Sequence, residues 1–244
     1  MVKSLTLKRV CRWLVTSGIG MVLLWAPRIA EAQADSSIYL QETVTELQKV
    51  WPGNRTINLV FHGHSVPAGY GDRHEVHTLE AYPHLLLEKL KEKYPYAPIN
   101  SIVTAIGGEN SIQGAARFEK EVLSHQPDVV FIDYALNDRS QDIHRVRQAY
   151  SNMIESALAR GIKVILLTPS PDQRVDIHAN NTSLDSLAKQ IHDLSEQYNV
   201  GFVDVYNVFK QVANEAGVES YMASVNHPNQ QGHALIVAEL LKWF

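Results

Sequence analysis

Short runs of apolar, mostly β-branched residues recur along the chain and alternate with longer segments of helical periodicity. The runs lie at residues 57–61, 101–105, 129–133, 162–168 and 201–205. Each run is apolar almost throughout, which is typical of strands covered on both faces of a sheet. Alternation of such strands with helices predicts an α/β fold built on a parallel sheet.

The segments between these runs carry apolar residues at the spacing of one helix face. This spacing predicts helices around residues 79–94, 143–157 and 184–198, and a last helix from about Gln230 to the C-terminus. Residues 35–55 are expected to form an N-terminal helix. Because no linker or repeat interrupts the alternation, we expect residues 35–244 to form one domain.

The first 34 residues have the layout of a secretory signal peptide. Four basic residues precede the mainly apolar stretch 14–25, and small-residue patterns follow at 30–34. The apolar stretch is shorter than the roughly 20 residues that span a bilayer. We therefore expect residues 1–34 to be cleaved after Ala32 or Ala34, leaving a secreted or periplasmic protein with no stable membrane anchor.

The charge of the chain changes when this segment is set aside. The 244 residues carry 22 basic and 26 acidic side chains, a net charge of −4, and residues 35–244 carry 17 and 25, a net charge of −8. An acidic surface argues against nucleic acid or an anionic membrane as partner and favours a neutral or small substrate. Cys11, the only cysteine, lies in the predicted signal peptide, so the remaining domain depends on its apolar core alone.

Polar and glycine-containing segments follow the predicted strands. In an open parallel sheet, ligands bind beyond the carboxyl ends of the strands, so these segments are expected to meet at one edge. They are His-Gly-His-Ser-Val-Pro at 62–67, Gly-Gly-Glu-Asn at 107–110, Tyr-Ala-Leu-Asn-Asp at 134–138 and, before the last helix, Asn-His-Pro-Asn at 226–229.

Two of these segments offer a nucleophile and a base. A serine hydroxyl needs a histidine within hydrogen-bond reach before it attacks a carbonyl carbon. Gly63 permits a sharp strand-to-helix turn that presents Ser65. His227 precedes Pro228, which favours an extended approach to the last helix, and Asn229 is expected to cap that helix.

Together, the four segments resemble those of the SGNH (GDSL-type) hydrolase family. The resemblance spans 57–244 and implies a three-layer α/β/α sandwich with a flavodoxin-like, five-stranded parallel sheet and no cofactor. It implies that Ser65 is the nucleophile and His227 the base, and that the Gly108 N–H, the Asn137 amide and the Ser65 N–H bind the oxyanion.

The sequence departs from the family pattern at three positions. His64 and Ala135 replace an aspartate and a glycine, and neither change removes an atom that takes part in the reaction. The third is Ser224, which stands where the family has the aspartate that orients the histidine. The candidate acceptors for the hydrogen bond from His227 Nδ1–H are then the Ser224 hydroxyl, a backbone carbonyl, or an acid from elsewhere such as Asp204 or Glu219.

Other kinds of site are disfavoured. His62 and His64, with His74 and His77 in the next loop, form a His-x-His plus His-x-x-His set, but no matching carboxylate pattern accompanies them, and we expect no metal. A Gly-x-Ser-x-Gly elbow is absent, because Pro67 stands at the second glycine position. No phosphate-binding glycine motif is present either.

The sequence thus predicts an exported serine esterase that acts on a short-chain acyl ester, with acetyl groups on carbohydrate as a candidate substrate. Two alternatives stay open. One is an O-acyltransferase that passes the acyl group to a glycan, and the other is a non-catalytic glycan-binding protein of the same fold.

Overall fold

A single parallel sheet forms the centre of the domain. The computed structural model describes residues 33–244, so the predicted signal peptide, residues 1–34, lies outside the described residues except for its last two. The strands pair in the order β2-β1-β3-β4-β5, the flavodoxin-like order, which confirms the predicted fold class. They are β1 (Ile57–Gly63), β2 (Ile99–Val103), β3 (Val129–Asp133), β4 (Lys163–Leu167) and β5 (Gly201–Val203).

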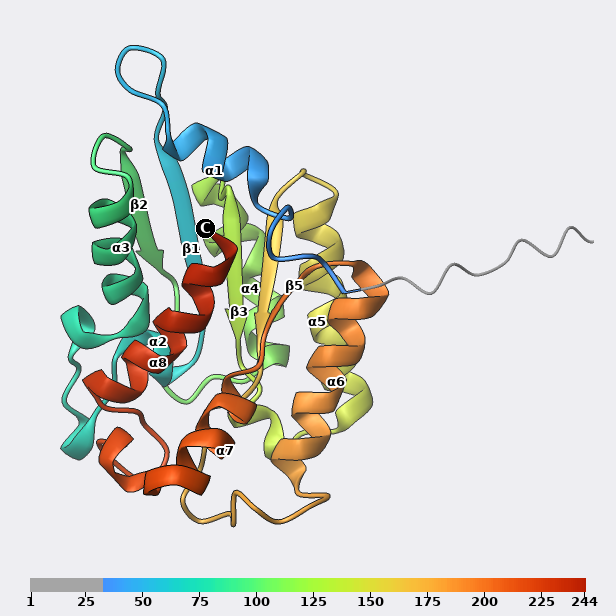
Figure 1. Ribbon diagram of the computed structural model, residues 1–244. Helices are drawn as coiled ribbons and strands as arrows, with labels where there is room; N and C mark the ends of the chain where they lie inside the picture. The colour runs from blue at the N-terminus through green and yellow to red at the C-terminus, as the bar shows by residue number, and fades with distance from the viewer. Residues whose placement is uncertain (1–32) are drawn as a thin grey trace, which may run out of the picture. The chain divides into compact units, whose positions relative to one another are not determined.

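Helices cover both faces of this sheet, giving three layers (Figure 1). In that view α8 crosses in front of the strands and α4 lies behind them. The helices are α1 (Gln41–Leu47), α2 (Ser65–Ala68), α3 (Tyr82–Lys93), α4 (Ser111–Glu121), α5 (Ile143–Leu158), α6 (Ser183–Tyr198), α7 (Val205–Ala216) and α8 (Gln230–Leu240).

Successive side chains of each strand enter two different hydrophobic cores. On β1, Leu59 and Phe61 pack in the core that α3 and α8 close, whereas Val60 packs in the core that α4 and α5 close. All three side chains are fully buried. Burying one such side chain contributes about 1.5–3 kcal/mol. Burial on both faces explains why the central strands β3 and β4 are apolar at most positions.

Two predicted helices differ in extent from the structure. Within residues 35–55 only Gln41–Leu47, the α1 helix, is α-helical. A separate turn follows at residues 51–53, which include Pro52 and Gly53. Leu79 lies in a short 3₁₀ turn before α3 and is exposed. The α3 helix begins at Tyr82 with Pro83 in its first turn, where the missing N–H removes no hydrogen bond.

The periodicity also missed α4 and α7. The face of α4 that packs inward buries Ser111 and Gly114 beside Phe118, so large apolar residues do not recur at helical spacing. The fifth predicted run extended to Val205, but α7 begins there. The Asp204 carboxylate accepts a hydrogen bond from the Asn207 N–H at 3.1 Å, which caps the helix and ends the strand.

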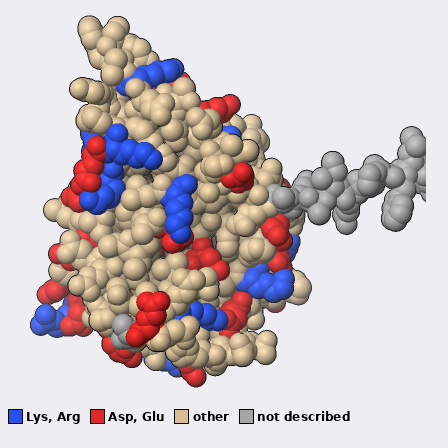
Figure 2. Space-filling view, viewed as in Figure 1, with Lys and Arg blue, Asp and Glu red and all other residues tan. Residues whose placement is uncertain are grey.

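Within residues 33–244, no helix is long and apolar enough to cross a membrane. On the face drawn in Figure 2, Lys and Arg side chains are interspersed with Asp and Glu and form no continuous basic patch over the described residues.

Two histidines are buried in a neutral form. Burial, reinforced by the positive charge of Arg117, lowers the pKa of His62 to about 4. The Nδ1 of His233 accepts a hydrogen bond from the Tyr82 N–H at 3.2 Å. Burial, with a smaller effect of His227, lowers the pKa of His233 to about 3. In the unfolded chain both rings titrate near pH 6.5, so the unfolded state binds more protons below that pH.

The free energy of unfolding should therefore fall as the pH decreases from about 6.5 toward 4. Replacing His62 by Gln removes one of the two groups and should reduce this loss by on the order of 3 kcal/mol. Urea denaturation at several pH values measures the free energy of unfolding of each protein, and the exposed His144→Gln is the control. Equal pH dependence in His62→Gln and the wild type would contradict the assignment.

Candidate active site

Ser65 lies at the first position of α2, immediately beyond the carboxyl end of β1. The turn into α2 requires glycine at position 63, because a Cβ atom there would lie 2.3 Å from the Asp133 carbonyl oxygen. His64 caps the short helix, and its Nδ1 accepts a hydrogen bond from the Val66 N–H at 3.2 Å. Ser65 is only 7% exposed, so a small part of the residue faces solvent.

The structure brings His227 to this serine across 162 residues of sequence. Its Nε2 lies 2.8 Å from Ser65 Oγ. The histidine loop folds back on itself: the His227 carbonyl accepts a hydrogen bond from the Ala223 N–H at 2.9 Å. The side chain of Asn229 accepts one from the Gly232 N–H at 3.0 Å, which confirms the predicted cap of α8. Both ends of the loop are thus held.

Ser224 is the partner of the other ring nitrogen. Its Oγ lies 3.0 Å from His227 Nδ1. The Ser224 loop is in turn held by Gln173, whose backbone N–H donates to the Val225 carbonyl at 2.7 Å. Asp204, one of the acids considered from the sequence, caps α7 instead. A hydroxyl can fix the tautomer and orientation of the imidazole, but it brings no negative charge.

Tyr70 packs against the histidine and was not anticipated from the sequence. Its ring lies 6.2 Å from the His227 ring, centroid to centroid, at an interplanar angle of 30°. On the other side, a Cβ atom at position 107 would lie 2.8 Å from Tyr70 Cζ. Tyr70 therefore links the histidine to the loop after β2. The only sequence signal is its place between Gly69 and Gly71, which is too common to indicate a site.

The loop after β2 forms a tight turn around Gly108. The Glu109 N–H donates to the Ile106 carbonyl at 3.2 Å, and Gly108, the third residue of the turn, has φ = 81°. A positive φ at this position is the mark of a type II turn and favours glycine. Within the described residues, the Gly108 N–H donates to no backbone or side-chain acceptor. It is available to a ligand.

This turn lies against the ends of β1 and β3. The Ile106 N–H donates to the Gly63 carbonyl at 3.1 Å, next to the serine turn. The Asn137 side-chain amide donates to the Glu109 carbonyl at 3.0 Å. One of its two amide hydrogens makes this bond, which leaves the second for a ligand. All four sequence segments therefore meet at one edge of the sheet, near α2 in Figure 1.

Buried carboxylates support the loop of Asn137. Asp138 accepts hydrogen bonds from both the N–H and the hydroxyl of Ser111, each at 2.9 Å. Burial raises the pKa of Asp138 to about 6, although the bonds from Ser111 oppose it. Arg139 pairs with the buried Asp172 at 3.0 Å. These contacts join the loop after β3 to α4 and to the loop after β4.

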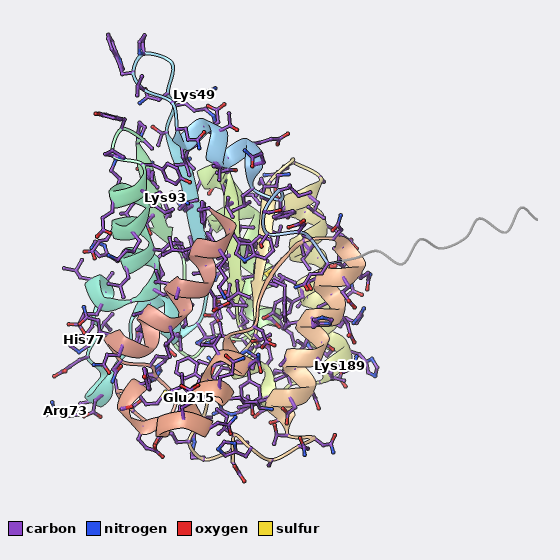
Figure 3. The ribbon with its side chains drawn as sticks, in the orientation of Figure 1. Lys49, Arg73, His77, Lys93, Lys189 and Glu215 are labelled. Atoms are coloured by element: carbon purple, nitrogen blue, oxygen red, sulfur yellow. The ribbon has the colours of Figure 1, made fainter. Side chains whose placement is uncertain are left out.

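Of the histidines in the sequence pattern, His62 and His77 lie in separate surroundings and do not share a position for a metal ion. Both ring nitrogens of His62 are hydrogen-bonded, Nδ1 to Thr104 Oγ1 at 2.9 Å and Nε2 to the Gly114 carbonyl at 3.2 Å. His77 lies on the outer loop between α2 and α3 (Figure 3), 3.4 Å from Glu75. Within the described residues, the side chains close enough together to share a metal ion are on α6, away from the serine: His192, Asp193 and Glu196.

Comparison with known proteins matches most of the chain to the family that the sequence segments resemble. Residues 61–235 match the model of the GDSL-like lipase/acylhydrolase family. An acetylxylan esterase of Geobacillus stearothermophilus is 23% identical over 194 residues, which cover 74% of this chain and 87% of that protein.

Solved structures share the fold. A variant of an acetyl xylan esterase from Geobacillus stearothermophilus superposes with a TM-score of 0.66 at 20% identity, covering 77% of this chain and 94% of the other. A lipase/acylhydrolase from Enterococcus faecalis gives a TM-score of 0.64 at 24% identity, covering 76% and 94%. From the family match, the chain belongs to the GDSL-like lipase/acylhydrolase family and is an enzyme that hydrolyses ester bonds.

Proposed function

We propose that this protein is an exported serine esterase that removes short acyl groups, acetyl above all, from carbohydrate, through an acyl-enzyme on Ser65. The observation that carries the proposal is the 2.8 Å contact between Ser65 Oγ and His227 Nε2 at the carboxyl edge of the sheet. A nucleophile and a base in direct hydrogen-bond contact are the minimum that acyl transfer by serine requires.

The geometry supports a two-step reaction. Ser65 Oγ attacks the ester carbonyl carbon while His227 Nε2 takes the hydroxyl proton. The N–H groups of Ser65 and Gly108 and the free hydrogen of the Asn137 amide donate to the oxyanion. As the tetrahedral intermediate collapses, His227 returns the proton to the leaving alcohol oxygen. Water then attacks the acyl-enzyme by the same steps, which releases the carboxylic acid and restores the Ser65 hydroxyl.

Carbohydrate acetyl groups are proposed as the substrate on two grounds. The curated relative is named for acetylxylan, and this chain covers 87% of its length. The acidic net charge of −8 over residues 35–244 suits a neutral polysaccharide better than a polyanion. Export is proposed from the signal-peptide layout of residues 1–34, with 35–244 as the catalytic domain. The same proposal excludes nucleic acid as a partner and a stable membrane anchor.

Hydrolysis of p-nitrophenyl acetate and of acetylated xylan by residues 35–244 tests the proposal. Ser65→Ala should lower kcat by at least about 10³-fold, because it removes the nucleophile. Ser186→Ala, on the exposed face of α6, is the matched control and should keep wild-type activity. Equal rates in Ser65→Ala and the wild type would refute the esterase mechanism. Transfer of acetyl to an added glycan in place of water would identify the acyltransferase alternative.

Replacing Ser224 by Asp should leave kcat unchanged or raise it. A carboxylate at this position can accept the hydrogen bond from His227 Nδ1–H as the hydroxyl does, and its negative charge also stabilises the imidazolium. Ser224→Ala removes the 3.0 Å contact and should lower kcat by about 10-fold, the effect of one modest hydrogen bond. The measurement is kcat for p-nitrophenyl acetate. A large loss of kcat in Ser224→Asp would mean that the serine hydroxyl itself is required.

Removing the Asn137 amide should lower kcat by about 10²–10³-fold with little change in KM, because the oxyanion exists in the transition state and not in the bound ester. Asn137→Ala makes this change, and Asn152→Ala, exposed on α5, is the control. Steady-state kinetics separates the two constants. An increase in KM at constant kcat would show that Asn137 binds the substrate in its ground state instead.

A further inference from the structure

A buried ion pair holds the loop that carries Gly108. The Glu109 carboxylate accepts hydrogen bonds from Arg117 Nε at 2.8 Å and from the Tyr134 hydroxyl at 2.7 Å. The Nη2 of the same guanidinium donates to the Thr104 carbonyl at 2.7 Å. Arg117, which lies on α4, therefore binds both ends of the segment 104–109.

The backbone of this segment determines where two proposed oxyanion donors lie. Gly108 directly precedes Glu109, and the turn is closed by the Glu109 N–H. The Glu109 carbonyl accepts the hydrogen bond from the Asn137 amide at 3.0 Å. A shift of Glu109 would thus move the Gly108 N–H and release Asn137 at the same time.

Capping of α4 does not explain the ion pair. The Asn110 side chain accepts hydrogen bonds from the N–H groups of Ile112 and Gln113, both at 3.1 Å. The Gln113 side chain accepts one from the Asn110 N–H, also at 3.1 Å. This capping box satisfies the start of the helix without Glu109.

Stability does not explain it either. The side chains of Glu109 and Arg117 are only 9% and 13% exposed. Removing two charges from water costs several kcal/mol per ion, and apolar residues of the same volume often stabilise a protein as well or better. Burial raises the pKa of Glu109, but the hydrogen bonds from Arg117 and Tyr134 outweigh it and hold that pKa below its ordinary value. The carboxylate therefore stays charged, and the pair persists, in mildly acidic solution.

We propose that Glu109 and Arg117 are positioning residues, which hold the Gly108 N–H and the Asn137 amide where the oxyanion forms. The inference rests on the proposed serine-esterase function, and it concerns residues that do not touch the substrate. Oxyanion donors must lie within about 0.5 Å of their productive position, and a displacement of about 1 Å can cost on the order of 100-fold in rate.

Glu109→Gln tests this role, because it keeps the volume of the side chain and removes its charge. The kcat for p-nitrophenyl acetate should fall by about 10- to 100-fold, with KM changed less than about 3-fold. Glu121→Gln is the matched control. Glu121 pairs with Nη1 of the same arginine at 3.2 Å on the exposed side of α4, so this variant should keep wild-type kinetics.

A second variant and a double-mutant cycle separate positioning from general support of the fold. Arg117→Lys keeps a cation but loses the contact of two guanidinium nitrogens, Nε and Nη2, with the Glu109 carboxylate, so kcat should fall in the same range. This variant carries the test if Glu109→Gln does not fold. In the Asn137→Ala background, Glu109→Gln should cost less than in the wild type, because one of the two donors that Glu109 positions is already gone.

Hydrogen exchange gives a measurement that needs no substrate. In Glu109→Gln, the peptide spanning 104–111 should exchange at least about 3-fold faster than in the wild type, while peptides from β3 and β4 keep their rates. An unchanged kcat, or full additivity with Asn137→Ala together with unchanged exchange, would overturn the inference. Absence of ester hydrolysis by the wild type would refute the proposed function, and exchange would still decide whether the pair holds the loop.

Discussion

The arrangement of the site depends on the carboxyl end of β1, where Gly63 lies against the backbone of β3. A side chain there would collide with the Asp133 carbonyl oxygen, at 2.3 Å from its Cβ atom. The Gly63 carbonyl accepts the hydrogen bond from the Ile106 N–H. Because β1 lies between β2 and β3, the loops after all three strands meet at this one backbone position. The serine turn and the Gly108 turn are therefore placed by the sheet itself.

Ser224 stands where the family pattern has an aspartate, and His227 still lies in hydrogen-bond contact with Ser65. Ser224 Oγ occupies the place next to His227 Nδ1, and the Ser224 loop is held by Gln173. A hydroxyl orients the ring and supplies no negative charge to the imidazolium. In the proposed reaction, orientation of the ring and the oxyanion donors both contribute to the rate acceleration, and the loop held by Glu109 and Arg117 carries one of those donors.

The sequence predicted the parts of the site that follow strand ends and missed the parts that depend on packing between elements. Ser65, Gly108 and Asn137 could be placed at one edge because parallel strands end together, and His227 was added by the family resemblance. Tyr70 could not, because its position follows from the close approach of Gly107. The Glu109–Arg117 pair was missed because α4 packs through Ser111 and Gly114, so the helix that carries Arg117 has no clear periodicity. The partner of His227 Nδ1 stayed open for a similar reason, since loop geometry decides it.

Covalent labelling measures the central claim, activation of Ser65 by His227, most directly. Residues 35–244 are treated with diethyl p-nitrophenyl phosphate, and the adduct is located by peptide mass spectrometry. The predicted result is one diethylphosphoryl group on Ser65 in the wild type, and little or none in His227→Ala over the same time. Labelling of another residue, or equal labelling of Ser65 in both proteins, would contradict it.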